Sequence, residues 1–345
     1  MLFHISQFFG MQDRQIRALI CLWLVISCSA PYKESNKFVD AVEPTPSASG
    51  YLSPNPIQGN LPEPRSSPGM TYDEERRVVV LVGGSASRKT LNDTWEYDGN
   101  QWRLIEMPPP MITYAPAMTY SQSLKKIVLI DWTPSIWEYD GLRWQQVLPQ
   151  NQLPRIWFPE IGYDPSLERI VVFGEVGAGS SYKTWLYDGV DLEKIDSSHP
   201  YYDWGVRGQS YDRIFFPSLV YDRKNREMIL QPPFKWTFVL KNNTWEIKLS
   251  EEQSTLPDCV YCIWPKMVYD TKRNLIVMFD GENTWELIDG NWTKIETPIS
   301  PPRRTGHAMA YDQARSVTVL FGGENENEEY LNDLWEYDGT TWVQR

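Results

Sequence analysis

Aromatic and charged side chains gather in one irregular segment of this sequence, residues 197–207 (SSHPYYDWGVR). Aromatic rings interleaved with an acid and a base are suited to stacking on a sugar ring or to filling a hot spot on a protein partner. The alternative is a loop that packs its own aromatics over the neighbouring strands. The first candidate binding residues are therefore Tyr201, Tyr202, Asp203, Trp204 and Arg207.

A second candidate set consists of arginines that precede a recurring tyrosine by seven or eight residues: Arg65, Arg155, Arg213 and Arg304. Guanidinium groups bind carboxylates in a bidentate fork, so four such groups around one opening would receive an anionic ligand. The alternative is that each arginine pairs with an acid of a neighbouring repeat. His307 lies three residues after the last arginine and joins the ligand-binding candidates.

Chemistry that needs a metal or a redox cofactor has little support. Cys259 and Cys262 (Cys-Val-Tyr-Cys) predict a local disulfide in an exported protein, whereas zinc would need two further ligands and only His199 and His307 follow the leader. A thioredoxin-type redox pair belongs at the start of a helix. Neither a Gly-X-Ser-X-Gly motif nor a phosphate loop is present. We expect no cofactor and assign no catalytic residue.

Composition and charge narrow the class of partner. The net charge is −12 over 345 residues, which argues against a nucleic acid or an anionic membrane surface as partner. With 16 Trp, 19 Tyr, 26 Pro and 21 Gly, the composition favours many short strands over long helices.

The amino-terminal residues read as an export signal. Arg14 and Arg17 precede the apolar run 18–26, which is too short to span a bilayer and typical of a signal peptide, with either Met1 or Met11 as start. Val-Ile-Ser-Cys at 25–28 resembles the lipobox of bacterial lipoproteins, which implies lipidation of Cys28. We expect a leader over 1–27, a Pro- and Ser-rich tether over 28–61 and a folded domain over 62–345 in the cell envelope.

The domain is built from an internal repeat of roughly 40 to 50 residues, a period typical of propellers and solenoids. Six units can be aligned on one tyrosine: Tyr72, Tyr120, Tyr163, Tyr221, Tyr269 and Tyr311. After each comes a short apolar run, such as 78–82, and then, in five of the six units, two aromatic residues seven positions apart, such as Trp95 and Trp102. In the third unit, Leu192 replaces the second aromatic residue. Those patterns predict four antiparallel strands per unit, here called A to D, with Tyr97 facing Trp102 across the last hairpin.

Single units leave an apolar face uncovered, and stacking six of them in a ring covers it. The prediction is an all-β protein, a six-bladed β-propeller of four-stranded antiparallel blades. The units resemble the Kelch repeat family: Gly83-Gly84 and Gly322-Gly323 look like its double glycine, and Leu91 to Asp98 and Leu331 to Asp338 like its third strand. Pro302 to Ala308 looks like its opening strand, and the resemblance covers about residues 62–345.

Variable B–C and D–A connections fall on one rim of such a ring, and binding usually resides in loops of this kind. The resemblance implies the same face. We expect a lipid-anchored module that binds a protein or a glycan there and touches the membrane through its anchor alone. Galactose oxidase has a related propeller, but its copper needs more His ligands than this sequence offers. The alternative function, also implied by the resemblance, is a metal-free carbohydrate mutarotase of the kind that acts on sialic acid.

Overall fold

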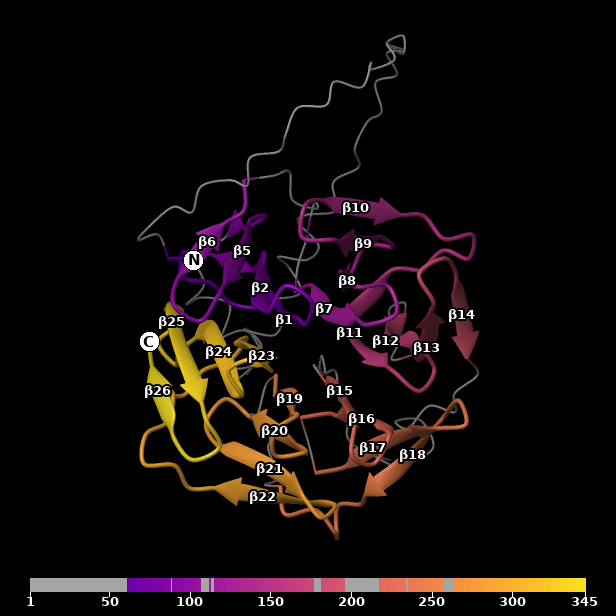
Figure 1. Cartoon of the computed structure of the whole chain (residues 1–345). Helices are drawn as coiled ribbons and strands as arrows, with labels where there is room; N and C mark the ends of the chain where they lie inside the picture. Colours follow the sequence, from indigo (N-terminus) through magenta and orange to yellow (C-terminus); the bar gives the residue numbers. More distant parts are fainter. Residues whose placement is uncertain are drawn as a thin grey trace, which may run out of the picture. The chain divides into compact units, whose positions relative to one another are not determined.

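In the computed structural model, residues 61–87, 89–106, 112, 115–176, 181–195, 217–233, 235–256 and 264–345 are described. The protein divides into two units, residues 1–52 and 53–345, and every described residue belongs to the second. This unit is a six-bladed β-propeller: six four-stranded antiparallel sheets follow one another around a ring (Figure 1). Within the described residues there is no helix.

Each blade runs outward from the ring axis in sequence order, as the repeat predicts. The A strands are β1 (Gly69–Asp73), β7 (Ala117–Ser121), β11 (Ile156–Asp164), β15 (Ser218–Asp222), β19 (Lys266–Asp270) and β23 (Ala308–Asp312). The B strands are β2 (Val78–Val82), β8 (Lys126–Ile130), β12 (Arg169–Val176), β16 (Glu227–Gln231), β20 (Leu275–Phe279) and β24 (Val317–Glu324). The C strands are β5 (Thr94–Tyr97), β9 (Ile136–Tyr139), β13 (Ser181–Tyr187), β17 (Thr237–Lys241), β21 (Thr284–Ile288) and β25 (Tyr330–Tyr337). The D strands are β6 (Trp102–Leu104), β10 (Trp144–Val147), β14 (Leu192–Ile195), β18 (Thr244–Leu249), β22 (Asn291–Ile295) and β26 (Trp342–Gln344).

The B strands are apolar without alternation because neighbouring blades cover both of their faces. Val79 and Leu81 belong to a core shared with the sixth blade, whereas Val80 and Val82 belong to one shared with the second, and all four are fully buried. One such apolar cluster fills every junction between blades, so stability is spread around the ring.

The aromatic pair has the predicted register in the first blade. Tyr97 pairs with Trp102 across the hairpin, and their ring centroids are 5.1 Å apart. Trp95 shares their apolar cluster with residues of the sixth blade. The hairpin turn is tighter in two other blades, where Asn242 and Asn243, and likewise Asp289 and Gly290, both adopt positive φ.

The ring closes without a shared strand, since the first and last blades each take all four strands from one continuous stretch of sequence. Closure instead uses the segment just before β1. Backbone hydrogen bonds run from the Arg65 amide to the Leu331 carbonyl, from the Gly323 amide to the Arg65 carbonyl and from the Ser67 amide to the Gly306 carbonyl. Gly323 has φ +105°, and a Cβ there would lie 2.7 Å from the Thr305 carbonyl oxygen. Glycine is therefore required where the connection to β23 passes this strand end.

Candidate functional site

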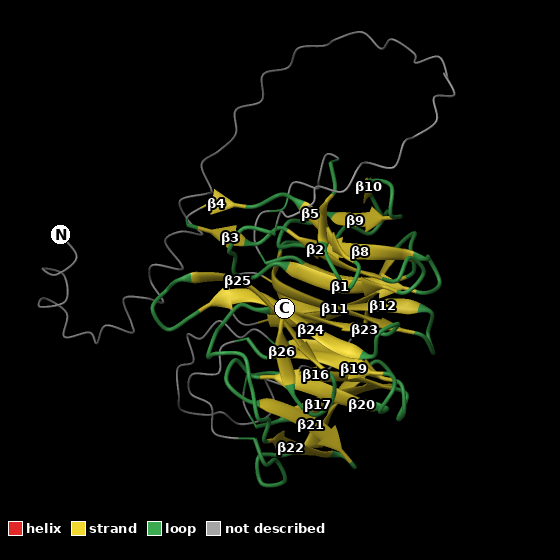
Figure 2. Ribbon diagram, turned by 60° about the vertical axis from the view of Figure 1, so that its left-hand side comes forward, coloured by secondary structure: helices red, strands yellow, loops and turns green. Residues whose placement is uncertain are grey.

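The B–C and D–A connections lie on one rim of the ring because the four strands of each blade alternate in direction. Figure 2 shows the small hairpin β3 (Ser85–Ala86) and β4 (Lys89–Thr90), part of the first B–C connection, on the same side as β25. The opposite rim carries short A–B turns in which a side-chain oxygen at the strand end accepts backbone N–H groups. This oxygen belongs to an aspartate in five blades, as Asp73 accepts from Arg76, and to Ser121 in the second. The longer and more varied connections are those of the first rim.

Two tryptophans and an arginine form an aromatic platform on this rim, defined as Trp132, Trp157 and Arg155. Trp132 lies in the second blade's B–C connection, and its ring centroid is 5.0 Å from that of Trp157 in β11. The Arg155 guanidinium carbon lies 5.6 Å from the Trp132 ring centroid. Both indoles are half-buried and Arg155 is exposed. Flat rings beside a cation offer a ligand stacking together with hydrogen bonding.

Backbone irregularity in β11 accounts for where the platform lies. The register of β11 against β12 shifts between Trp157 and Glu160, and Phe158 within this bulge has φ +49°. A bulky residue in the left-handed region is strained, and such strain persists where the surrounding structure holds it in place. Bulges re-aim side chains, and Trp157 next to this one contacts Trp132 of the second blade.

The same backbone kink recurs before the A strands of other blades. Each kink is a residue with positive φ, two positions before the first residue of the regular A-strand pairing. These residues are Ser67, Ala115, Phe158, Trp264 and Gly306. The residue after the kink is Pro68, Pro116, Pro159 and Pro265 in four of these blades, and His307 in the sixth.

An ion pair connects two A strands that are not neighbours in the ring. Lys266 Nζ in β19 donates to Glu160 Oε1 in β11 at 2.7 Å, although β15 of the fourth blade lies between those strands in ring order. We call these two residues the axial pair. Their side chains are 30% and 15% exposed, so solvent reaches both. Burial raises the pKa of Glu160, and the Lys266 charge opposes that rise.

Two of the predicted arginines are buried and form ion pairs within their own blades. Arg65 binds both oxygens of Asp93, at 2.6 and 2.8 Å, and Arg304 binds Asp333 with the same two distances. Both guanidinium groups also donate to backbone carbonyls, among them Gly83 and Gly322 at 2.9 and 3.0 Å. Neither side chain is exposed to solvent. Each arginine, in the segment that precedes an A strand, therefore binds an acid at or near the start of the C strand of its own blade and not an acid of a neighbouring blade.

The counterions of these arginines are held ionised. Burial alone would raise the pKa of Asp93, but hydrogen bonds and charge from Arg65 outweigh it, so the pKa lies below its usual range. The pKa of Asp333 is lowered in the same way by Arg304. Trp95 and Trp335 each donate an indole N–H to one of these carboxylates. Among the predicted arginines only Arg155 is both described and exposed, and Arg213 lies outside the described residues.

His307 is 1% exposed and lies edge-on to Phe279, with ring centroids 5.2 Å apart. Burial, together with the charges of Arg304 and Lys266, lowers the pKa of its imidazole to about 3. Neither ring nitrogen has a hydrogen-bond partner among the residues that the structure describes. The imidazole is therefore neutral near pH 7.

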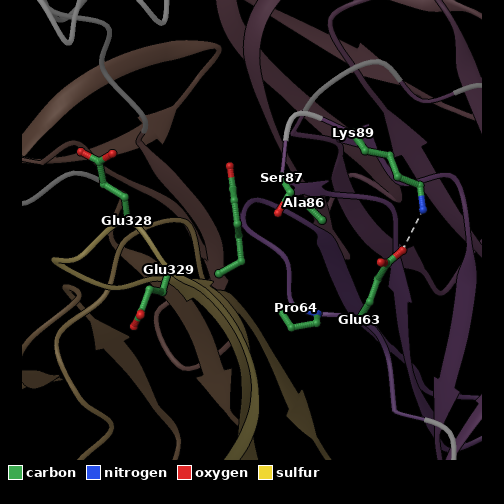
Figure 3. A pocket seen from close by; sticks show the side chains of 8 residues that line it. Glu63, Pro64, Ala86, Ser87, Lys89, Glu328 and Glu329 are labelled. Atoms are coloured by element: carbon green, nitrogen blue, oxygen red, sulfur yellow. Dashed lines mark hydrogen bonds and ion pairs between the residues drawn. The ribbon is translucent and has the colours of Figure 1, made fainter.

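A groove of about 450 Å³ follows the seam between the first and sixth blades on the same rim (Figure 3). Its charged lining is mainly acidic, with Glu63, Glu328 and Glu329 against Lys89, which pairs with Glu63 at 3.0 Å. Glu328 and Glu329, from the B–C connection of the sixth blade, form one wall of this groove. In the described part of the protein no group of three His, Cys, Asp or Glu side chains is placed to hold a metal ion.

Several predicted site residues lie outside the described residues: Tyr201, Tyr202, Asp203, Trp204, Arg207, Cys28, Cys259 and Cys262. The platform tryptophans and the axial pair were missed in the sequence. A signal for the pair exists, since four of the six residues three positions ahead of the aligned tyrosines are small and the other two are Glu160 and Lys266. For Trp132 the signal is weaker. It is an aromatic residue in the B–C connection of the second blade, which lacks the double glycine that the first and sixth blades have there.

The sequence matches no protein-family model and no curated protein. Among solved structures, that of YjhT is similar, with a TM-score of 0.55 and 11% sequence identity over 83% of this chain and 99% of the YjhT chain. At that identity the likeness concerns the fold alone, and the class established here is the six-bladed β-propeller. Nowhere in the described residues does a helix have the length and apolarity needed to cross a membrane.

Proposed function

We propose that this protein is an exported, lipid-anchored propeller of Kelch type that binds a glycan through its B–C and D–A rim. The aromatic platform is the observation that carries the proposal. Two half-buried indoles 5.0 Å apart, with an exposed guanidinium over one of them, present apolar faces beside a hydrogen-bond donor. Sugar rings have apolar C–H faces edged by hydroxyls, and this combination complements them better than it does a charged peptide.

The recurring kinks support a binding role for the rim. Strain of this kind clusters at ligand sites, because there the position of a side chain matters more than its conformational cost. Phe158 and Trp264 are bulky residues in the left-handed region, and both are half-buried. Because these side chains are already held in place, the protein loses less conformational entropy when a ligand binds.

Glycan arrays probed with the folded domain, residues 62–345, test the proposal. We expect binding that falls at least tenfold in Trp132→Ala and in Trp157→Ala. Leu142→Ala is the matched control, since Leu142 is 78% exposed in a C–D turn on the opposite rim. Retention of full affinity in both tryptophan variants removes the platform from the site. Binding to a protein partner with no glycan hit would replace the ligand class but keep the rim.

Export and anchoring need a separate measurement on the full-length protein. Incorporation of labelled palmitate is expected for the natural sequence and not for Cys28→Ala, which should be released from the membrane fraction. Equal membrane retention of both proteins would contradict the anchor.

The axial pair favours a second candidate function, a metal-free sugar mutarotase. Anomer exchange needs a base that takes the proton of the anomeric hydroxyl as the ring C–O bond breaks, and an acid that protonates the ring oxygen; reclosure on the other face returns both protons. Glu160 and Lys266 place an acceptor and a donor together. NMR exchange rates between α and β anomers of any sugar that binds decide the matter: acceleration abolished by Glu160→Gln would replace the account based on binding alone.

A further inference from the structure

The axial pair interrupts a layer that is otherwise made of small side chains. Six residues stand three positions before the aligned tyrosines, where the A strands begin or are about to begin their regular pairing: Gly69, Ala117, Glu160, Ser218, Lys266 and Ala308. Four of the six blades place a small residue at this position. The Ser218 hydroxyl is already used, because it accepts the backbone N–H of Met267 at 3.0 Å.

Stability does not explain why two blades depart from this pattern. A partly exposed ion pair contributes little to stability, and even a buried one can often be replaced by uncharged residues at no cost. The neighbouring blades show that an alanine or a glycine fits this layer. The two charges therefore have to be explained by something other than packing.

Within the described residues, both members of the pair retain hydrogen-bonding capacity that their mutual contact does not use. An ammonium has three N–H donors and a carboxylate about four acceptor positions. The hydrogen bond between Lys266 and Glu160 uses one donor and one oxygen. Since both side chains are partly exposed, the remaining donors and acceptors can be reached from solvent.

An indole and two hydroxyls meet on the same rim, in the segments that precede β19 and β1. Trp264 precedes Lys266 by two residues and adopts φ +81°. A Cβ on Gly306 would meet the Ser66 hydroxyl at 2.1 Å, the Trp264 ring at 2.9 Å and the Ser67 hydroxyl at 3.1 Å. The fifth, sixth and first blades thus bring an aromatic face and two hydroxyls together at one point, and Gly306 is the residue that allows it.

We propose that the axial pair is the recognition group of a second subsite, which holds one polyhydroxylated ring, a sugar in its cyclic form. This inference rests on the proposed glycan-binding function and names what occupies the ring axis. One hydroxyl of a vicinal pair donates to Glu160, its neighbour accepts from Lys266, and Trp264 covers an apolar face of the ring. The ion pair stays intact, so a neutral sugar fits it better than an anion, which would have to displace Glu160.

The test uses free monosaccharides instead of glycans. Saturation-transfer NMR of the domain with D-glucose, D-galactose, D-mannose and N-acetyl-D-glucosamine measures the axial subsite, and the acyclic polyol D-glucitol separates a cyclic ring from a flexible one. We expect at least one cyclic sugar to bind, and its affinity to fall at least tenfold in Glu160→Gln and in Lys266→Met. D-Glucitol should bind at least tenfold more weakly than that sugar.

The double variant Glu160→Ala/Lys266→Ala guards against misfolding, because it makes the layer small throughout, as Ala117 and Ala308 do in their own blades. It should melt within a few degrees of the natural protein and bind no monosaccharide. Absence of any monosaccharide binding to the natural protein, or unchanged affinity in both single variants, overturns the subsite. Trp132→Ala reports on the platform alone: loss of array binding with monosaccharide binding retained separates the two sites, and failure of the platform leaves the axial result standing.

Discussion

The phenol of Tyr97 in the first blade donates to Glu336 Oε1 in the sixth blade at 3.1 Å, and so joins two residues 239 positions apart in the sequence. The same contact joins other neighbouring blades: Tyr139 to Glu96, Tyr187 to Glu138 and Tyr337 to Glu286, at 2.9 to 3.0 Å. At the remaining two junctions both partners are replaced together, by Leu240 with Leu186 and by Leu287 with Val239. A tyrosine is thus kept only where the preceding blade supplies a carboxylate.

Ring closure should contribute as much as any other junction that carries this contact. Tyr97→Phe leaves Glu336 paired with Arg315 and Arg345, and Tyr139→Phe leaves Glu96 paired with Arg76 and Arg103. Each variant should lower the free energy of unfolding by about 1.5 kcal/mol, the lower end for a hydrogen bond to a charged group. Urea denaturation measures both. A cost for Tyr139→Phe without one for Tyr97→Phe would mean that the first and last blades do not meet in solution.

A second contact across the junctions predicts a difference between two otherwise matched tryptophans. Trp342 donates its indole N–H to the Thr284 hydroxyl at 2.9 Å, whereas the buried indole N–H of Trp102 has no partner among the described residues, because Leu334 occupies the threonine position. Their surroundings are alike, since each packs 5.1 Å from a tyrosine ring and edge-on to a phenylalanine. Trp342→Phe should therefore cost about 1 kcal/mol more than Trp102→Phe, by urea denaturation.

The control supplies the missing hydroxyl. In a Leu334→Thr background, Trp102→Phe should become as costly as Trp342→Phe is in the natural protein. If Trp102→Phe is the more costly substitution in both backgrounds, the hydrogen bond is not what separates the two sites.

The paired replacements also predict that the tyrosine and the carboxylate are energetically coupled, which a double-mutant cycle at the junction between the second and third blades can measure. Tyr187 and Glu138 are both buried, and burial together with the Glu138 charge raises the pKa of the phenol, which keeps it a proton donor. Tyr187→Phe should cost about 1.5 kcal/mol in the natural protein and close to nothing in Glu138→Leu, since the hydroxyl then has no carboxylate to bind. Thermal or urea unfolding of the four proteins gives the coupling. Additive costs would show that the hydroxyl and the carboxylate act independently.

Much of the fold could be predicted from the sequence because the same pattern of residues recurs in every blade of a propeller. The tyrosine and the apolar run locate strands A and B, and Tyr97 facing Trp102 follows from the hairpin alone. The junction contacts were less accessible, since Tyr97 and Glu336 pair only once the number and direction of the blades are known. Their paired losses, Leu186 with Leu240, are visible in the sequence in retrospect.

The site was harder to predict, for two physical reasons. Arg65 and Arg304 have the spacing expected of ligand-binding groups. Their burial against Asp93 and Asp333 depends on the folded structure and cannot be seen in the sequence. Trp157 reaches the platform because of a bulge and a positive φ at Phe158. The residue types at positions 157 and 158 predict neither the bulge nor the positive φ. Sequence periodicity reports what every blade shares, and a binding site is built where the blades differ.

His307 makes the stability of the ring depend on pH in a predictable direction. The pKa of its imidazole is about 3 in the folded protein, below the ordinary value of 6.5, so between these values the unfolded protein binds a proton that the folded one does not. Protons therefore favour unfolding, and stability is complete above pH about 6.5 and is lost as pH falls toward 3. The contribution should decline by up to about 1.4 kcal/mol per pH unit.

Two substitutions isolate that contribution from the carboxylates that titrate below pH 5. His307→Pro introduces the residue that stands at the same place in the other blades, as at Pro68 and Pro265, and His307→Gln keeps a polar side chain that does not titrate. The difference in unfolding free energy between the natural protein and each variant, measured in urea at pH 7, 6, 5 and 4, should shift steadily in favour of the variants as the pH falls. A difference that is constant over this range would show that the imidazole titrates normally, and hence that water reaches it between the fifth and sixth blades.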